Sequence, residues 1–88
     1  MAQTIVFSHY EDSKHTVNTP SIFFRIQQER TENCWTIHFG DEYAGMINYH
    51  EHHTKKWSSV VMGVVREYDS AQQACERVFR CILELHKD

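Results

Sequence analysis

This sequence of 88 residues contains little glycine and proline, no CxxC pair and no long apolar run. Its three cysteines, Cys34, Cys75 and Cys81, are an odd number and form no CxxC pair. They therefore exclude a disulfide-framed secreted domain and predict free thiols in a reducing, cytoplasmic location. The longest apolar stretch, Val60–Val65, is far too short to span a bilayer, so no membrane partner is expected. The segment Met1–Thr4 has no basic region before an apolar run, and we expect no signal peptide.

Catalytic and cofactor motifs are also missing. Gly40, Gly45 and Gly63 are too scattered to form a phosphate-binding loop. The carboxylate pairs Glu11–Asp12 and Asp41–Glu42 fall in turn-like segments, where such pairs are normally solvated. No serine has the flanking residues of a nucleophile elbow. The sequence therefore predicts a protein that is not an enzyme and needs no cofactor.

The charge balance is mildly acidic. The chain has 9 lysine and arginine residues against 12 aspartate and glutamate residues, which gives a net charge of −3 with neutral histidines. Proteins that grip nucleic acid need a basic excess to release counterions from phosphates, and this chain has none. A nucleic-acid-binding module that uses the open face of a sheet therefore stays the alternative hypothesis. Its candidate contacts are Phe23, Arg25, Arg30, Lys55, Lys56 and Trp57.

The apolar pattern predicts one α+β domain, an antiparallel β-meander of four or five strands packed against one C-terminal α-helix. Apolar and polar residues alternate in short stretches that are separated by turn-like clusters, which indicates half-buried strands. The four expected strands are Ile22–Gln28, Cys34–Phe39, Tyr43–His50 and Trp57–Val65, the last one bent or bulged at Gly63. Thr4–Phe7 would be the fifth strand. The segment from His9 to Thr19 is expected to be a polar loop.

After Asp69 the apolar spacing changes to three and four, which indicates an amphipathic helix. Ser70 and Gln73 match a capping box at its start. The stripe expected to face the sheet contains Ala71, Ala74, Cys75, Val78, Phe79, Ile82 and Leu85. The face expected in solvent contains Gln72, Gln73, Glu76, Arg77, Arg80, Glu84 and Lys87.

The strand that contains Trp35 sets the expected register. Trp35, Ile37 and Phe39 share one face, and a turn of three or five residues would align that face with the apolar side of the next strand. A turn of two residues would invert the alignment, because a slip of one residue flips every side chain. The apolar side in question contains Tyr43, Gly45, Ile47 and Tyr49.

One helix can cover only one face of the sheet, so the other face is expected to meet water or a partner. The side chains expected there are Phe23, Arg25, Cys34, Thr36, His38 and Met46. Among them, we take Phe23, Arg25, Thr36 and His38 as the candidate partner-binding residues.

A histidine-rich segment is the densest group of metal-ligand types. His50, His52 and His53 could hold zinc, copper or nickel, or respond to pH. The spacing matches no zinc signature, and the alternative is a solvated loop between two strands.

The function favoured by these observations is a small non-enzymatic protein–protein interaction module. A chain of this size without linkers suits a regulator or inhibitor that binds the surface of a larger protein, of the kind that mobile genetic elements often encode. An open sheet with exposed edges also suits strand addition or a homodimer, since a small domain gains by burying more surface.

Overall fold

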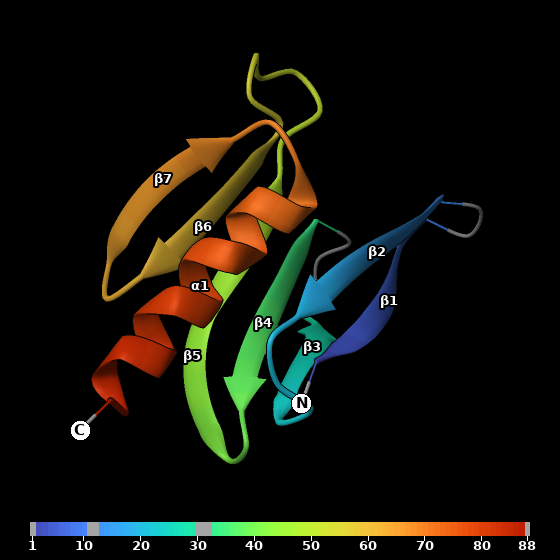
Figure 1. Ribbon diagram of the computed structural model, residues 1–88. Coiled ribbons are helices and arrows are strands. Elements are labelled where there is room, and N and C mark those ends of the chain that lie inside the picture. The colour runs from blue at the N-terminus through green and yellow to red at the C-terminus, as the bar shows by residue number, and fades with distance from the viewer. Residues whose placement is uncertain (1, 11–12, 30–32, 88) are drawn as a thin grey trace.

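The computed structural model describes residues 2–10, 13–29 and 33–87. The chain folds into a β-hairpin, a five-stranded antiparallel sheet and one C-terminal helix, an α+β architecture as predicted (Figure 1). The carboxylate pair Glu11–Asp12 and the middle of the polar segment 29–33 lie outside the described residues. The elements are β1 (Gln3–Tyr10), β2 (Ser13–Thr19), β3 (Phe24–Gln28), β4 (Cys34–Phe39), β5 (Glu42–Tyr49), β6 (Trp57–Val61), β7 (Val64–Tyr68) and α1 (Ala71–Leu85).

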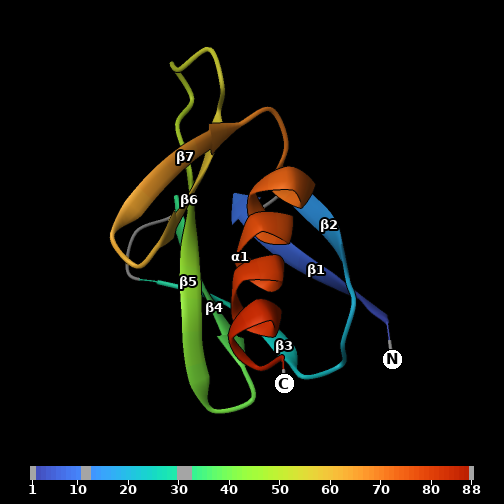
Figure 2. The ribbon, with the colours of Figure 1, turned by 60° about the vertical axis from the view of Figure 1, so that its left-hand side comes forward.

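The helix and the hairpin lie on the same side of the large sheet (Figures 1 and 2). Strands β3 to β7 follow one another in chain order, α1 packs on β5, β6 and β7, and β1 packs on β3. Phe7 and Val17 of the hairpin are buried beside Trp35 and Trp57 of the sheet. The helix and hairpin together therefore supply one layer over the inner face of the sheet.

The N-terminal hairpin answers one question that the sequence left open and corrects one prediction. Thr4–Phe7 does form a strand, but it pairs with β2 and does not join the large sheet. The segment predicted as a loop contains the strand β2. Its outward side chains Lys14, Thr16 and Asn18 are polar and exposed, and this polar composition is typical of a loop. Val17, between them, is fully buried.

The segment predicted as one strand, Trp57–Val65, is two strands joined by a tight turn. Met62 and Gly63 both have positive φ, 52° and 78°, and Val61 pairs with Val64. Positive φ at both central residues is the geometry of a two-residue type I′ hairpin turn. Gly63 therefore reverses the chain, and the bulge predicted there is wrong.

The predicted register between β4 and β5 is confirmed over most of its length, but the turn that joins the two strands differs from the predicted one. Trp35 lies opposite Ile47, and Ile37 lies opposite Gly45, as predicted. The turn nevertheless has two residues, since Phe39 pairs with Glu42, and a register shift between Ile37 and His38 restores the alignment. Because of this shift, Tyr43 lies opposite His38 and is half exposed, which corrects its predicted inward position.

The helix begins as predicted. The Oγ atom of Ser70 accepts a hydrogen bond from the backbone N–H of Gln73 at 3.2 Å, and Oε1 of Gln73 accepts one from the N–H of Asp69. Six of the seven predicted stripe residues are buried, but Leu85 is 61% exposed at the last position of the helix. Arg77, predicted to be in solvent, is buried. Its Nη1 atom donates hydrogen bonds to the backbone carbonyls of Ser59 in β6 and Val64 in β7 and to the Ser59 hydroxyl.

No helix among the described residues is long and apolar enough to cross a membrane.

Candidate functional site

The outer face of the large sheet, which we call the open face, faces away from α1 and the hairpin (Figure 2). Strand alternation assigns its side chains, because Trp35, Ile37 and Ile47 are fully buried on the inner side. The open face contains Arg25, Gln27, Cys34, Thr36, His38, Tyr43, Met46, Asn48, Ser58, Val60, Val65 and Glu67.

The register arranges this face in three cross-strand rows. One outer row is polar and contains Cys34, Asn48, Ser58 and Glu67. The middle row contains Gln27, Thr36, Met46, Val60 and Val65. The other outer row contains Arg25, His38 and Tyr43. An apolar stretch from Met46 to Val65 therefore lies between two rows of polar and aromatic side chains.

The structure brings together three of the four predicted partner-binding residues. Arg25 lies directly opposite His38, and Thr36 lies on the same face two residues along β4, where it is 4% exposed. Phe23 is 60% exposed but sits in the turn before β3, with its ring 6.0 Å from that of Phe39, which packs against the core. Phe23 is therefore separate from the open face.

Tyr43 is an open-face residue that the sequence pattern placed on the inner face. Its ring meets that of His38 edge-on, with the centroids 5.8 Å apart. Arg25 stands on the other side of His38, and its Nη2 donates a hydrogen bond to the carbonyl oxygen of Gly40 at 3.0 Å. A guanidinium, an imidazole and a phenol thus stand in one row, which suits recognition of a polar or charged group on a partner.

The thiol on the open face is kept protonated. Cys34 is half-buried, and its Sγ lies 3.8 Å from Sδ of Met46. Burial, with a smaller contribution from the negative charge of Glu29, raises the pKa of the Cys34 thiol. A raised pKa lowers the fraction of thiolate, so Cys34 is a weaker nucleophile at neutral pH than an ordinary exposed thiol.

The predicted metal-ligand segment is folded against the polar row. The rings of His50 and His53 stack with centroids 4.5 Å apart. Nε2 of His50 lies 3.0 Å from Oγ of Ser58, and Nδ1 of His53 lies 3.3 Å from Oε2 of Glu67. In the part of the chain that the structure describes, no group of three or more His, Cys, Asp or Glu side chains is placed to hold a metal ion. Metal binding by His50, His52 and His53 stays a prediction.

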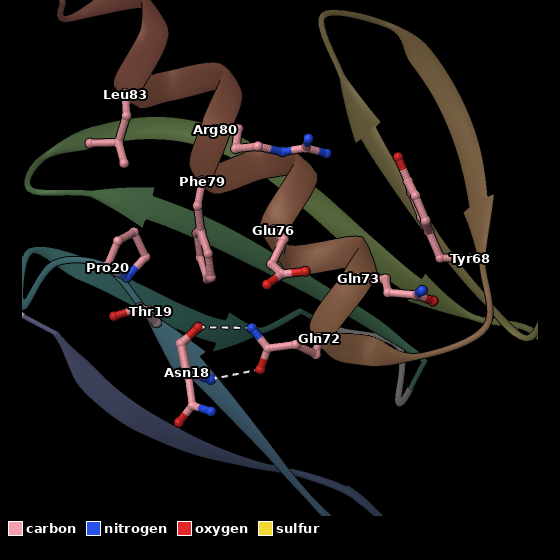
Figure 3. Close-up of a pocket in the computed structure, with 10 residues that line it drawn as sticks. All are labelled: Asn18, Thr19, Pro20, Tyr68, Gln72, Gln73, Glu76, Phe79, Arg80 and Leu83. Carbon is pink, nitrogen blue, oxygen red and sulfur yellow. Dashed lines mark hydrogen bonds between the residues drawn. The ribbon is translucent and has the colours of Figure 1, made fainter.

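A shallow trough of about 910 Å³ runs along the outer surface of α1 (Figure 3). It is lined by Asn18, Thr19, Pro20, Tyr68, Gln72, Gln73, Glu76, Phe79, Arg80 and Leu83. Gln72 forms one wall, where its side-chain amide accepts from the N–H of Asn18 at 2.8 Å and donates to the carbonyl of Asn18 at 2.9 Å. Both polar ends of this amide are therefore used to join the helix to the hairpin.

Comparisons with protein-family models, with curated proteins and with solved structures find no match for this chain. The functional inference therefore rests on the chain's own residues and geometry.

Proposed function

We propose that this chain is a small non-enzymatic protein–protein interaction module, a regulator or inhibitor that binds the surface of a larger protein partner. The open face supports this proposal, since all its strands are backed by a packed layer on one side only. A rigid scaffold of this kind holds side chains on its free face in fixed positions, which lowers the entropy lost on binding.

The arrangement of the open face resembles the anatomy of a protein interface. Protein interfaces have an apolar centre, a polar rim and an enrichment of tyrosine and arginine. Met46, Val60 and Val65 supply the centre, and Arg25 and Tyr43 belong to the row beside it. The face also carries Glu67, and arginine and histidine are its only side chains that can be positively charged, so it offers little grip on phosphates.

The location we propose is cytoplasmic. Cys34, Cys75 and Cys81 are all free thiols in the structure, which supports a reducing compartment.

The test is capture of the partner from a lysate of the native cell, with and without nuclease, using three variants beside the parent. Arg25→Glu and His38→Glu alter the open face. Lys14→Glu is the control for Arg25→Glu, because it makes the same charge change at an exposed position of the hairpin. We expect one protein retained near stoichiometry by the parent and by Lys14→Glu, and at least tenfold less of it with the two open-face variants.

Two results would contradict the proposal. Equal retention by Arg25→Glu, His38→Glu and the parent would place the binding site elsewhere. A retained fraction that disappears with nuclease would favour the nucleic-acid alternative. Sedimentation of the purified parent tests whether the partner is a second copy of this chain.

A further inference from the structure

The sheet has two edge strands, and they are protected differently. At the β3 edge, Nε2 of Gln3 donates to the backbone carbonyls of Phe24 at 2.9 Å and Ser21 at 3.2 Å, and β1 packs alongside. At the β7 edge, no strand or helix of the described chain lies beyond the strand (Figure 1). Alternate residues of β7 therefore direct their N–H and C=O groups away from β6 into open space.

The side chains of β7 do not block the approach of another strand. Val64 is 50% exposed and Val65 is 60% exposed, and they project to opposite sides of the sheet. Strand β7 contains no proline, and its pairing with β6 shows no bulge. Natural proteins usually protect an edge with proline, a bulge, charged side chains or a covering element. Of these, β7 has only the charged side chains of Arg66 and Glu67, so its edge stays open to strand addition by a segment of complementary charge.

Positive charge gathers along this edge. A hollow of about 410 Å³ at the edge is lined by Lys55, Arg66, Glu67 and Tyr68. The one carboxylate in it, Glu67, lies 3.3 Å from His53. Neither Lys55 nor Arg66 forms an ion pair with another described residue. The hollow therefore presents two cations and one carboxylate, a net positive charge, to any strand laid along β7.

The helix adds further positive charge on the inner side of the same edge. The guanidinium of Arg80 extends from α1 towards the β6–β7 hairpin (Figure 3). Arg77 is buried beside β7, and its Nη1 donates to the carbonyl of Val64 at 2.9 Å and to the carbonyl of Ser59 at 2.8 Å. Among the described residues, no carboxylate pairs with Arg77 or Arg80. The electrostatic field at the β7 edge thus favours an acidic strand.

We propose that the β7 edge binds an extended acidic segment of a protein partner, which adds a strand to the sheet and directs carboxylates towards Lys55, Arg66 and Arg80. Backbone hydrogen bonds to β7 provide the affinity for the added strand, and the cationic side chains provide the preference for an acidic sequence. This surface is distinct from the open face, and the inference shares with the proposed function only the premise of a protein partner.

A second copy of this chain fits the edge less well. In a twofold antiparallel pairing centred on Arg66, two arginines lie directly opposite each other, and a pairing centred on Glu67 opposes two glutamates. Like charges directly opposite are destabilising. A pairing centred on Val65 avoids this but brings a second Arg66 to an edge that is already cationic.

The test uses the full chain and a fluorescein-labelled peptide of alternating valine and glutamate, with a valine–lysine peptide as the control ligand. We expect the glutamate peptide to raise the fluorescence anisotropy and to shift the amide NMR signals of β7. The lysine peptide should do neither. The double variant Lys55→Glu, Arg66→Glu should bind the glutamate peptide at least tenfold more weakly, and Arg80→Glu should weaken it less. Lys14→Glu reverses a charge at an exposed position of β2, away from β7, and should leave binding unchanged.

Three results with the peptide would overturn the inference: no binding of the glutamate peptide, equal weakening by Lys14→Glu, or amide shifts outside β7 and its neighbours. A fourth is a change of the β7 signals with protein concentration alone, which would mean that copies of the chain pair with each other. Failure of the open face is distinguishable. Peptide binding at β7 with no partner captured through Arg25 and His38 would contradict the proposed function and support this inference.

Discussion

The two faces of the large sheet come from the same strands but have opposite surroundings. On the inner face, Ile37 and Ile47 are fully buried under α1 and the hairpin, whereas Met46 and His38, one residue away along each strand, are only partly buried. Because successive side chains of a strand point to opposite faces, neighbouring residues of one strand lie in the core and on the outer surface. Inner residues hold the fold together, and the outer residues that stay exposed or half-buried can meet a partner.

Adjacent residues of β5 give the largest contrast between the faces. Ile47→Ala should lower the free energy of unfolding by about 3–4 kcal/mol, because it removes buried methyl groups and leaves a cavity under the helix. Met46→Ala should cost less, about 1–2 kcal/mol, because Met46 is only partly buried and its removal leaves no enclosed cavity on the open face. Urea unfolding of the two variants measures both values. Equal losses would mean that something covers the open face in solution.

Arg77 tests the polar part of the inner face. Arg77→Ala should cost about 2–3 kcal/mol, since the carbonyls of Ser59 and Val64 and the Ser59 hydroxyl lose a charged donor in a buried place. Arg80→Ala is the matched control, because Arg80 is exposed on the next turn and should cost less than about 0.5 kcal/mol. Thermal unfolding of both variants decides the matter, and an unchanged melting temperature in Arg77→Ala would contradict the role given to these hydrogen bonds.

The sequence predicted the inner face better than the outer one, for a physical reason. Burial requires apolar side chains, so periodicity alone located the helix stripe and the register of Trp35 with Ile47. Open-face residues obey no such requirement. Tyr43 reaches that face only through a register shift in β4–β5 pairing, and such a shift leaves no mark on the apolar pattern.

The errors in the predicted fold have the same origin. Strand β2 was missed because Val17 is the only strongly apolar residue in it. The reversal at Met62–Gly63 was read as a bend because methionine seldom adopts positive φ. Arg77 was placed in solvent because helical spacing carries no information about carbonyl groups on another strand. Each error depends on backbone geometry or on a backbone partner, and the apolar pattern reveals neither.

The buried thiol of Cys75, on the helix that covers the inner face, makes the stability of the fold depend on pH. Burial, with a smaller contribution from Glu76, raises the pKa of Cys75 from its ordinary 9.0 to about 12. Between these values the unfolded chain has lost the proton and the folded chain keeps it, so stability falls as pH rises, by about 1.4 kcal/mol per pH unit. Below pH 9 both states are protonated and the effect vanishes. Urea unfolding at several pH values should show a steeper fall of stability in the parent than in Cys75→Ala, where only the raised pKa values of Cys34 and Tyr43 still contribute.

Alkylation gives an independent check on the same residue. Iodoacetamide should modify the half-buried Cys34 and Cys81 in the native protein, and Cys75 only after unfolding. Native-state modification of Cys75 at the rate of Cys34 would contradict the burial that raises its pKa.

The smallest expected effect concerns Ser58, which is 1% exposed although it belongs to the open face. The ring of His50 covers it, with Nε2 at 3.0 Å from the hydroxyl, and His53 stacks on that ring. His50→Ala should therefore cost about 1 kcal/mol, because the hydroxyl loses a shielded partner. His53→Ala should cost less, since its contact with Glu67 is exposed on both sides. Amide exchange at Ser58 should speed up in His50→Ala and change less in His53→Ala. If exchange at Ser58 is unchanged in both variants, His50 and His53 do not cover the polar row in solution. The polar row would then be as accessible to a partner as the rest of the open face.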